Sequence, residues 1–218
     1  MKLILDFDDA LFNAKELKDV IFRVLREHGV ENGEELYTRE RSKVGNIFMP
    51  KEFLKNACSA LDMEDSDVVT EVNVDELYDE IMSECPRLIN QGLVVLTTSV
   101  GKENCYIISN GSQEFQMDKM KRSGVGALVG SIIVVPGSKK QEIEKICRKF
   151  PNEEVIFADN KSIFFDDLDR EVCNNLKTVL YNENGLESLM AEIEVSRLSE
   201  QSRGKEISTQ TPTGPGMR

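Results

Sequence analysis

Carboxylates gather at the end of the apolar run 2–5 near the N-terminus, where Asp6 and Asp8 flank Phe7. A short apolar run ending in acids is typical of a buried parallel strand that delivers polar groups to a sheet edge, where ligands of open α/β sheets bind. Residues two apart in a strand point the same way, so both carboxylates are expected to face one small site. Crowded carboxylates repel each other unless a cation lies between them or one holds a proton. The alternative is that Asp8 or Asp9 only caps the next helix.

Three later apolar runs also end in polar residues of particular types. The polar residues are Ser109 with Asn110, the pair Lys139 and Lys140, and Asp159 with Asn160. Because the carboxyl ends of parallel strands lie at one edge of a sheet, these side chains are expected to converge on Asp6 and Asp8. Thr97 and Thr98, after the apolar run 93–96, offer a rival strand end with the same hydroxyl chemistry.

The elements that must position these groups alternate between strand and helix patterns. Strand-like runs are predicted at 93–97, 106–109, 132–135, 155–158 and 178–181, with helical stretches between most of them. This alternation is typical of a parallel sheet covered by helices on both faces, so we expect an α/β fold with three αβα layers, a Rossmann-like sheet.

The chain also divides by composition. A helix with one buried stripe is predicted at 14–28, and the pattern stays helical and charged to about residue 90. We therefore expect an α/β core made of 1–13 and 93–195, with a helical subdomain at 14–92 inserted into it. From 196 to 218 the chain is rich in Ser, Thr, Gln, Gly and Pro, which predicts a disordered tail.

Composition limits the partners. The 218 residues carry a net charge of −12 and are 40% hydrophobic, which permits a real core but argues against nucleic acid or an anionic membrane as main partner. The five cysteines lack metal-binding spacing and are expected to be reduced thiols. Met1 leads straight into the first strand without a basic leader or a long apolar segment, so we expect a cytoplasmic protein.

The order of these motifs resembles the haloacid dehalogenase (HAD) superfamily of phosphohydrolases. The matching pieces are Leu3-Ile4-Leu5-Asp6-Phe7-Asp8, Ile107-Ile108-Ser109-Asn110, a lysine opening the helix after 132–135, and Val155-Ile156-Phe157-Ala158-Asp159. The resemblance implies a HAD-like core, a helical cap inserted after the first motif, and Mg²⁺-dependent hydrolysis of a small phosphorylated metabolite through an aspartyl-phosphate.

The resemblance also implies a role for each matching residue. Asp6 would be the nucleophile, and Asp8 would protonate the leaving oxygen and later take a proton from water. The phosphate would be bound by Ser109, Asn110 and one lysine. Magnesium would be held by Asp6, the main-chain carbonyl of Asp8, Asp159 and Asn160.

Which lysine takes part stays open. In the resembling enzymes it stands four residues before the first buried helix position, which gives Lys139 when counted from Ile143, with Lys140 as the alternative. Two departures from the family pattern are Asp9-Ala10, where Gly-Thr or Gly-Val is common, and Asn160, where a second acid is usual. Asp166 and Asp167 lie beyond the usual spacing and are interpreted as helix-start or surface acids.

No residue pattern in the cap sequence identifies the substrate. Its cations are either solvated or available to an anionic substrate, namely Arg39, Arg41, Lys43, Lys51 and Lys55. His28 is interpreted as a helix-end residue near the C-terminal dipole. The alternatives to a phosphatase are a phosphomutase of the same fold and a degenerate member that only binds proteins.

Overall fold

A parallel sheet forms the base of the molecule in the computed structural model, which describes residues 1–43, 47–61 and 73–208. The described residues form a five-stranded sheet in the order β3-β2-β1-β4-β5. The strands are β1 (Lys2–Leu5), β2 (Cys105–Asn110), β3 (Ser131–Val135), β4 (Val155–Asp159) and β5 (Leu176–Leu180). The three-layer α/β prediction is confirmed, and the first strand of the chain lies at the sheet's centre.

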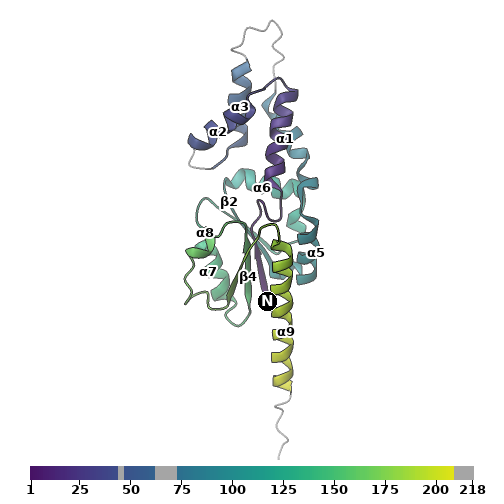
Figure 1. Cartoon of the computed structure of the whole chain (residues 1–218), viewed down its shortest axis with the longest axis vertical. Coiled ribbons are helices and arrows are strands. Elements are labelled where there is room, and N and C mark those ends of the chain that lie inside the picture. Colours follow the sequence, from purple (N-terminus) through teal and green to yellow (C-terminus); the bar gives the residue numbers. More distant parts are fainter. Residues whose placement is uncertain (44–46, 62–72, 209–218) are drawn as a thin grey trace, which may run out of the picture.

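Alternation along the central strand divides the core into two layers. Ile4 packs into the hydrophobic cluster on the α7 and α8 side, whereas Leu3 and Leu5 join the larger cluster on the other side. The first face is covered by α7 (Lys140–Lys149) and α8 (Ile163–Asp166), and the second by α5 (Gln91–Val100) and α9 (Gly185–Ser208) (Figure 1). Because both faces are covered, β1 is apolar at every position after Lys2, and Leu3, Ile4 and Leu5 are fully buried.

The inserted helices stand beyond the carboxyl edge of the sheet (Figure 1). They are α1 (Ala14–Glu27), α2 (Gly33–Lys43), α3 (Pro50–Leu61) and α4 (Val74–Ser83), followed by a 3-10 turn, η1 (Cys85–Leu88). Between them and the sheet lies α6 (Gln113–Ser123), which contacts both α4 and η1. We call α1 to α4 with η1 the cap.

The chain enters and leaves the cap through two adjacent segments. The amide of Asn13 donates to the carbonyl of Leu88 at 2.9 Å, and the amide of Asn90 donates to the carbonyl of Leu11 at 2.9 Å. Each asparagine also caps a helix, because Asn13 Oδ1 accepts from the amide of Glu16 and Asn90 Oδ1 from that of Gly92. The segments that enter and leave the cap are therefore bonded to each other side by side.

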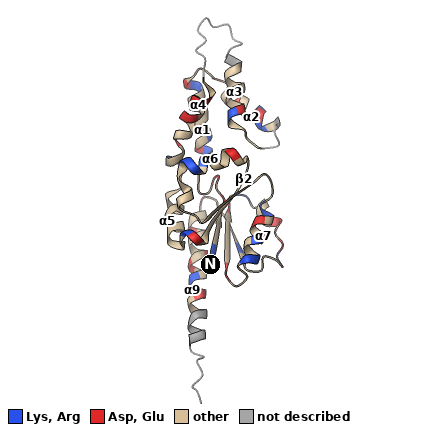
Figure 2. Cartoon of the chain, turned by 180° about the vertical axis from the view of Figure 1, so that it is seen from behind, with Lys and Arg blue, Asp and Glu red and all other residues tan. Residues whose placement is uncertain are grey.

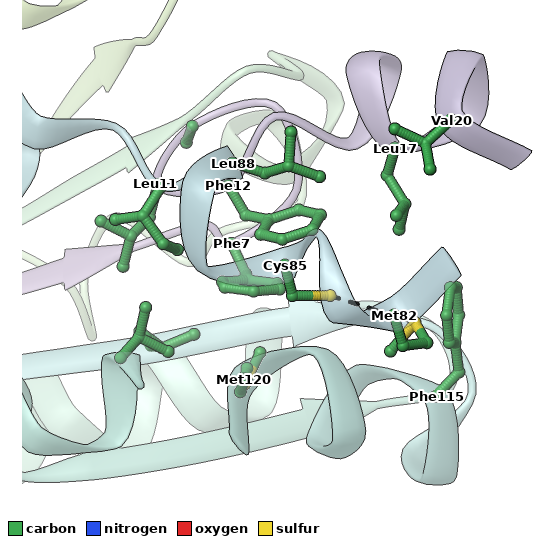
Figure 3. Close-up of a cluster of buried hydrophobic side chains, with 14 of the residues drawn as sticks. Phe7, Leu11, Phe12, Leu17, Val20, Met82, Cys85, Leu88, Phe115 and Met120 are labelled. Atoms are coloured by element: carbon green, nitrogen blue, oxygen red, sulfur yellow. Dashed lines mark hydrogen bonds between the residues drawn. The ribbon is translucent and has the colours of Figure 1, made fainter. Parts of the chain in front are cut away.

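Phe7 and Phe12 fill the space beneath these two segments. Their rings stack with centroids 4.9 Å apart, and the cluster continues through Cys85, Leu88 and Met120 (Figure 3). The loop after β1 therefore buries aromatic side chains while its carboxylates face the sheet edge.

The strand predicted at 93–97 is wrong, because these residues belong to α5. A short apolar run is ambiguous between a strand and a buried helix, and here the neighbouring residues decide. Asn90 caps the helix start, Gly101 ends it, and Leu93, Leu96 and Thr97 are buried at helical spacing against the sheet.

The disordered tail predicted from residue 196 is wrong at least to Ser208, where α9 ends. Leu189, Ile193 and Ser196 are buried at helical spacing, so the helix continues to pack past the predicted boundary. Glu200 then accepts a bond from the Met1 amino group at 2.6 Å. Residues 209–218 lie outside the described part of the chain.

Two further expectations concern thiols and membranes. The described cysteines are free thiols, as predicted, and all except the half-buried Cys58 are buried. No helix within the described residues is long and apolar enough to cross a membrane.

The packing of α9 predicts a contrast between two of its apolar residues. Ile193 is 2% exposed, whereas Met190 is 53% exposed. Ile193→Ala is expected to lower the free energy of unfolding by about 2–4 kcal/mol, because it leaves a cavity against the sheet, whereas Met190→Ala should change it by less than about 0.5 kcal/mol. Urea unfolding of both variants measures the difference, and equal losses would contradict the packing of α9.

Candidate active site

A lysine bridges two buried carboxylates at the carboxyl edge of the sheet. Lys139 Nζ lies 2.7 Å from Asp6 Oδ1 and 2.6 Å from Asp159 Oδ2. The side chains of Lys139, Asp6 and Asp159 are 1%, 8% and 0% exposed. The cation expected between crowded carboxylates is therefore partly supplied by the protein, and it pairs Asp6 with Asp159 rather than with Asp8.

The positions of these three residues follow from their elements. Asp6 leaves the central strand with its amide bonded to the Ala158 carbonyl at 2.9 Å, which places it beside the end of β4. Asp159 is the last residue of β4, and its Oδ1 accepts from the amide of Lys161 at 2.8 Å. Lys139 precedes α7, whose Ile143 is fully buried against the sheet, so the lysine is directed at the sheet edge.

The two candidate lysines differ in environment. Lys139 is buried between the carboxylates, whereas the Lys140 side chain is 44% exposed and lies 3.8 Å from Glu144 on its own helix. The structure therefore brings Lys139 to Asp6 and leaves Lys140 outside.

Asp8 lies at the same edge but contacts a different cation. Lys119 Nζ bonds its Oδ1, and Gln116 Nε2 donates to its Oδ2 at 2.7 Å. The Lys119 side chain is 2% exposed and its ammonium lies 4.7–5.4 Å from the ring centroids of Phe7, Phe12 and Phe115. The carboxylate of Asp8 stays 29% exposed, so it faces the space between core and cap.

Sequence reasoning missed Lys119 and Gln116. Both lie on α6, on the side that also buries Phe115 and Met120. A lysine at a buried position of a helix stripe needs a partner, because burying an unpaired charge is costly. That mismatch was the available signal, but it does not name Asp8 as the partner.

Two buried oxygen atoms at the sheet edge have no hydrogen-bond partner among the described residues. They are Ser109 Oγ, at the end of β2, and Asn160 Oδ1, next to Asp159. An unsatisfied buried polar atom costs about 1–3 kcal/mol, so each is well suited to a bound ligand, ion or water. The rival hydroxyls of Thr97 and Thr98 lie on α5, where both bond the Val94 carbonyl.

The side-chain amide of Asn110 bonds the main chain of a neighbouring loop and is not free to bind a ligand. Its Nδ2 donates to the carbonyl of Gly137 at 2.6 Å, which ties the end of β2 to the loop before Lys139. Asp166 is exposed, and Asp167 accepts from Ser138 at 3.4 Å, which agrees with their interpretation as surface acids.

The departure at Asp9 has a backbone explanation. Asp9 has a φ of 57°, in the left-handed region that glycine adopts most easily and that aspartate tolerates better than most residues. Its amide donates to the Phe12 carbonyl at 2.7 Å and its Oδ1 accepts from the amide of Lys15 at 3.1 Å. The turn that a glycine would favour is therefore kept.

The donor set fits magnesium rather than a caged transition metal. Across 1–43, 47–61 and 73–208, no three His, Cys, Asp or Glu side chains are grouped to hold a metal. Asp6 and Asp159 share one lysine, and Asn160 adds an amide oxygen that has no hydrogen-bond partner in the described part of the chain. Mg²⁺ commonly takes one or two carboxylates and keeps several waters, so this sparse oxygen set fits it.

Burial also alters the acidity of Asp6. Desolvation raises the pKa of Asp6 from 3.8 to about 7, because the attraction of Lys139 offsets burial only in part and Asp159 adds repulsion.

The buried bridge predicts unequal roles for the two neighbouring lysines. Lys139→Met is expected to lower the free energy of unfolding by about 3–5 kcal/mol in EDTA, because it leaves two buried carboxylates without their cation. Lys140→Met removes the same charge at an exposed position and should cost less than about 1 kcal/mol. Chemical denaturation compares them, and a larger loss in the Lys140 variant would contradict the assigned bridge.

The raised pKa of Asp6 predicts a pH-dependent effect of Asp6→Asn. Between pH 3.8 and about 7 the folded parent keeps a proton on Asp6 that the unfolded chain has released, so this group's contribution to stability falls as the pH rises. The Asp6→Asn variant keeps Asn160 and Lys139 but has no titratable group at position 6. Its stability therefore does not show the fall with pH that Asp6 causes in the parent. In EDTA, the Tm of Asp6→Asn relative to the parent is expected to be higher at about pH 8 than at about pH 5. A difference in Tm between Asp6→Asn and the parent that does not grow with pH would contradict the raised pKa of Asp6.

Comparison with known proteins supports the fold. No protein-family model matches the chain, and no curated protein matches its sequence. Among solved structures, a Burkholderia xenovorans LB400 protein assigned to the haloacid dehalogenase-like hydrolases is similar with a TM-score of 0.59, 17% identity, and coverage of 84% of this chain and 86% of that one.

Two further structures have the same architecture. A haloacid dehalogenase-like family hydrolase of Xanthomonas campestris gives a TM-score of 0.51 at 13% identity, over 93% of this chain and 94% of that one. A Thermotoga maritima protein assigned to the β-phosphoglucomutases gives 0.50 at 16% identity, over 84% and 88%. With its central Asp6 strand and inserted helices, the chain therefore has the fold of the haloacid dehalogenase-like hydrolases.

Proposed function

We propose that this chain is a Mg²⁺-dependent phosphohydrolase that acts on a small phosphorylated metabolite through an aspartyl-phosphate on Asp6. The observation that carries the proposal is the buried bridge of Lys139 between Asp6 and Asp159, beside the unpartnered Ser109 Oγ. A carboxylate nucleophile, a cation and a hydroxyl donor at one sheet edge are what attack on a phosphate dianion requires.

In the proposed reaction, an Asp6 carboxylate oxygen attacks phosphorus and the ester oxygen leaves. Lys139 holds Asp6 in place and offsets negative charge, since its Nζ lies 2.7 Å from Asp6 Oδ1. The Ser109 hydroxyl, which has no partner among the described residues, donates to a phosphoryl oxygen. Covalent capture divides a difficult hydrolysis into two displacements, and water then releases phosphate from Asp6.

Asp8 acts as the general acid and then the general base. An alkoxide leaving group needs a proton, whereas a halide leaves as a stable anion, so a second carboxylate beside Asp6 favours an oxygen ester over a haloacid. Gln116 and Lys119 hold the Asp8 carboxylate at the mouth of the space below the cap. The proposal takes this space, which Asp8 lines, as the place of the leaving group.

Magnesium fits beside the same carboxylates. Its ligands would be Asp6, Asp159, the main-chain carbonyl of Asp8 and Asn160, and when bound it would neutralise charge on the phosphate. Asn160 replaces a usual acid but offers an unpartnered amide oxygen, so the departure does not remove a ligand.

The first test is release of inorganic phosphate from phenyl phosphate by the parent and by Asp6→Asn, with Mg²⁺ and with EDTA. The parent is expected to release phosphate only with Mg²⁺, and Asp6→Asn should lose at least about a thousandfold in kcat, since the amide cannot form the covalent intermediate. Asp166→Asn is the matched control, because Asp166 is exposed and outside the site.

The outcomes separate three functions. Equal phosphate release by the parent and Asp6→Asn would overturn the nucleophile assignment. Transfer of phosphate between two positions of a sugar phosphate, with little release, would indicate the phosphomutase alternative. Absence of turnover together with failure to bind beryllium fluoride, a mimic of the phosphoryl group, would indicate the non-catalytic alternative.

A further inference from the structure

A cavity of about 140 Å³ lies between the core and the cap, directly above Asp8. The core side is formed by Asp8, Lys119 and residues after β2, and the cap side by α1, α2 and Phe48. Its small volume, against roughly 300–1,000 Å³ for pockets that bind drug-sized ligands, indicates a small leaving group.

The cavity is rich in cations although the chain as a whole is acidic. It is lined by Lys18, Arg41, Lys119 and Lys161, with Asp8 as the acidic side chain facing them. The whole chain has 27 Lys and Arg against 39 Asp and Glu, and both signs are interspersed over the helices in Figure 2. The excess of positive charge in the cavity is therefore a local feature.

Most of these cations are not neutralised by a described carboxylate. Lys119 pairs with Asp8, whereas Lys18, Arg41 and Lys161 form no ion pair within residues 1–43, 47–61 and 73–208. The Arg41 guanidinium instead bonds the Tyr37 hydroxyl at 3.3 Å, with its carbon 5.8 Å from the Tyr37 ring centroid. Arg41 is thus held at the cavity by an uncharged group, which leaves its charge available to a ligand.

Aromatic rings form the apolar wall beside these cations. Tyr37 lies 4.8 Å from Phe48 between ring centroids, and Phe48 lies 5.8 Å from Phe115. All three line the cavity. A leaving group that fits must therefore present both an apolar body and negative charge.

We propose that the substrate is a small phosphomonoester whose leaving group has an apolar body and a second anionic group, a carboxylate or a phosphate, bound by Arg41 and Lys18. This inference rests on the proposed function, because it assumes that the reacting phosphate lies at Asp6 and Lys139. The second anion then lies beneath the cap, on the far side of Asp8 from Asp6.

The other cations of the cap helices can be compared with Arg41. Arg39 is exposed and does not line the cavity, Lys51 pairs with Asp75 at 2.8 Å, and Lys55 is exposed. Among the described cap cations that sequence reasoning left open, Arg41 is the one that lines the cavity.

The test measures calorimetric binding of non-hydrolysable aryl phosphonates to the full chain with Mg²⁺. The probes are phenylphosphonate, 4-carboxyphenylphosphonate, 1,4-phenylenebisphosphonate and 4-(aminomethyl)phenylphosphonate. The carboxylated probe is expected to bind about tenfold more tightly than phenylphosphonate, and the cationic probe more weakly. A higher affinity for the bisphosphonate than for the carboxylate would assign a phosphate as the second anion, and the reverse would assign a carboxylate.

Arg41→Gln should abolish the tenfold preference for the anionic probes, and Lys18→Gln should reduce it. Arg39→Gln, on the same helix, should retain it. Equal affinities across the charge series, or a preference that survives in Arg41→Gln, would overturn the inference. A charge preference without phosphate release from phenyl phosphate would support the anion subsite and overturn the proposed hydrolysis. Phosphate release without a charge preference would support the proposed hydrolysis and overturn the anion subsite.

Discussion

The buried ion pair of Lys139 with Asp6 and Asp159 is the constraint on which the rest of the structure depends. Two carboxyl groups within the fold's interior are tolerable only if a cation lies between them or one holds a proton, since an unpaired buried charge is strongly destabilising. That requirement fixes where β1, β4 and the start of α7 meet. At the same edge of the sheet, Ser109 Oγ and Asn160 Oδ1 are buried without a hydrogen-bond partner among the described residues, so this edge is the part of the fold that is most costly to bury.

The helix α6, between cap and sheet, separates the two carboxylates of the first loop. Asp6 is directed at Lys139, whereas Asp8 is held by Lys119 and Gln116 from α6. Each acid therefore has its own cation and its own environment, one nearly closed to solvent and one open toward the cavity. Such divergence between neighbouring carboxylates is what allows one to attack and the other to transfer protons.

In the proposed function, selectivity would come from the charge and the space of the cavity. Arg41 is positioned by the Tyr37 hydroxyl and ring rather than by a carboxylate, so binding an anion there does not require breaking an ion pair. The aromatic side chains of Tyr37, Phe48 and Phe115 form an apolar wall on one side of the cavity. Electrostatic interactions with a ligand are stronger where water is excluded.

The sequence by itself determined most of the sheet, the helical insertion, the placement of Asp6, Ser109 and Asp159 at strand ends and that of Lys139 at a helix start, because periodicity and abrupt polar endings are local properties of the chain. It could not determine that 93–97 is a helix, since a short apolar run fits both structures until its neighbours are packed. That the helix α9 continues through 196, with Ser196 buried, likewise depends on contacts with the core. Only the tertiary structure paired Lys119 of α6 with Asp8 and brought Lys18 and Arg41 of the cap to the cavity, because which distant side chains meet is decided by how the helices pack on one another and on the sheet.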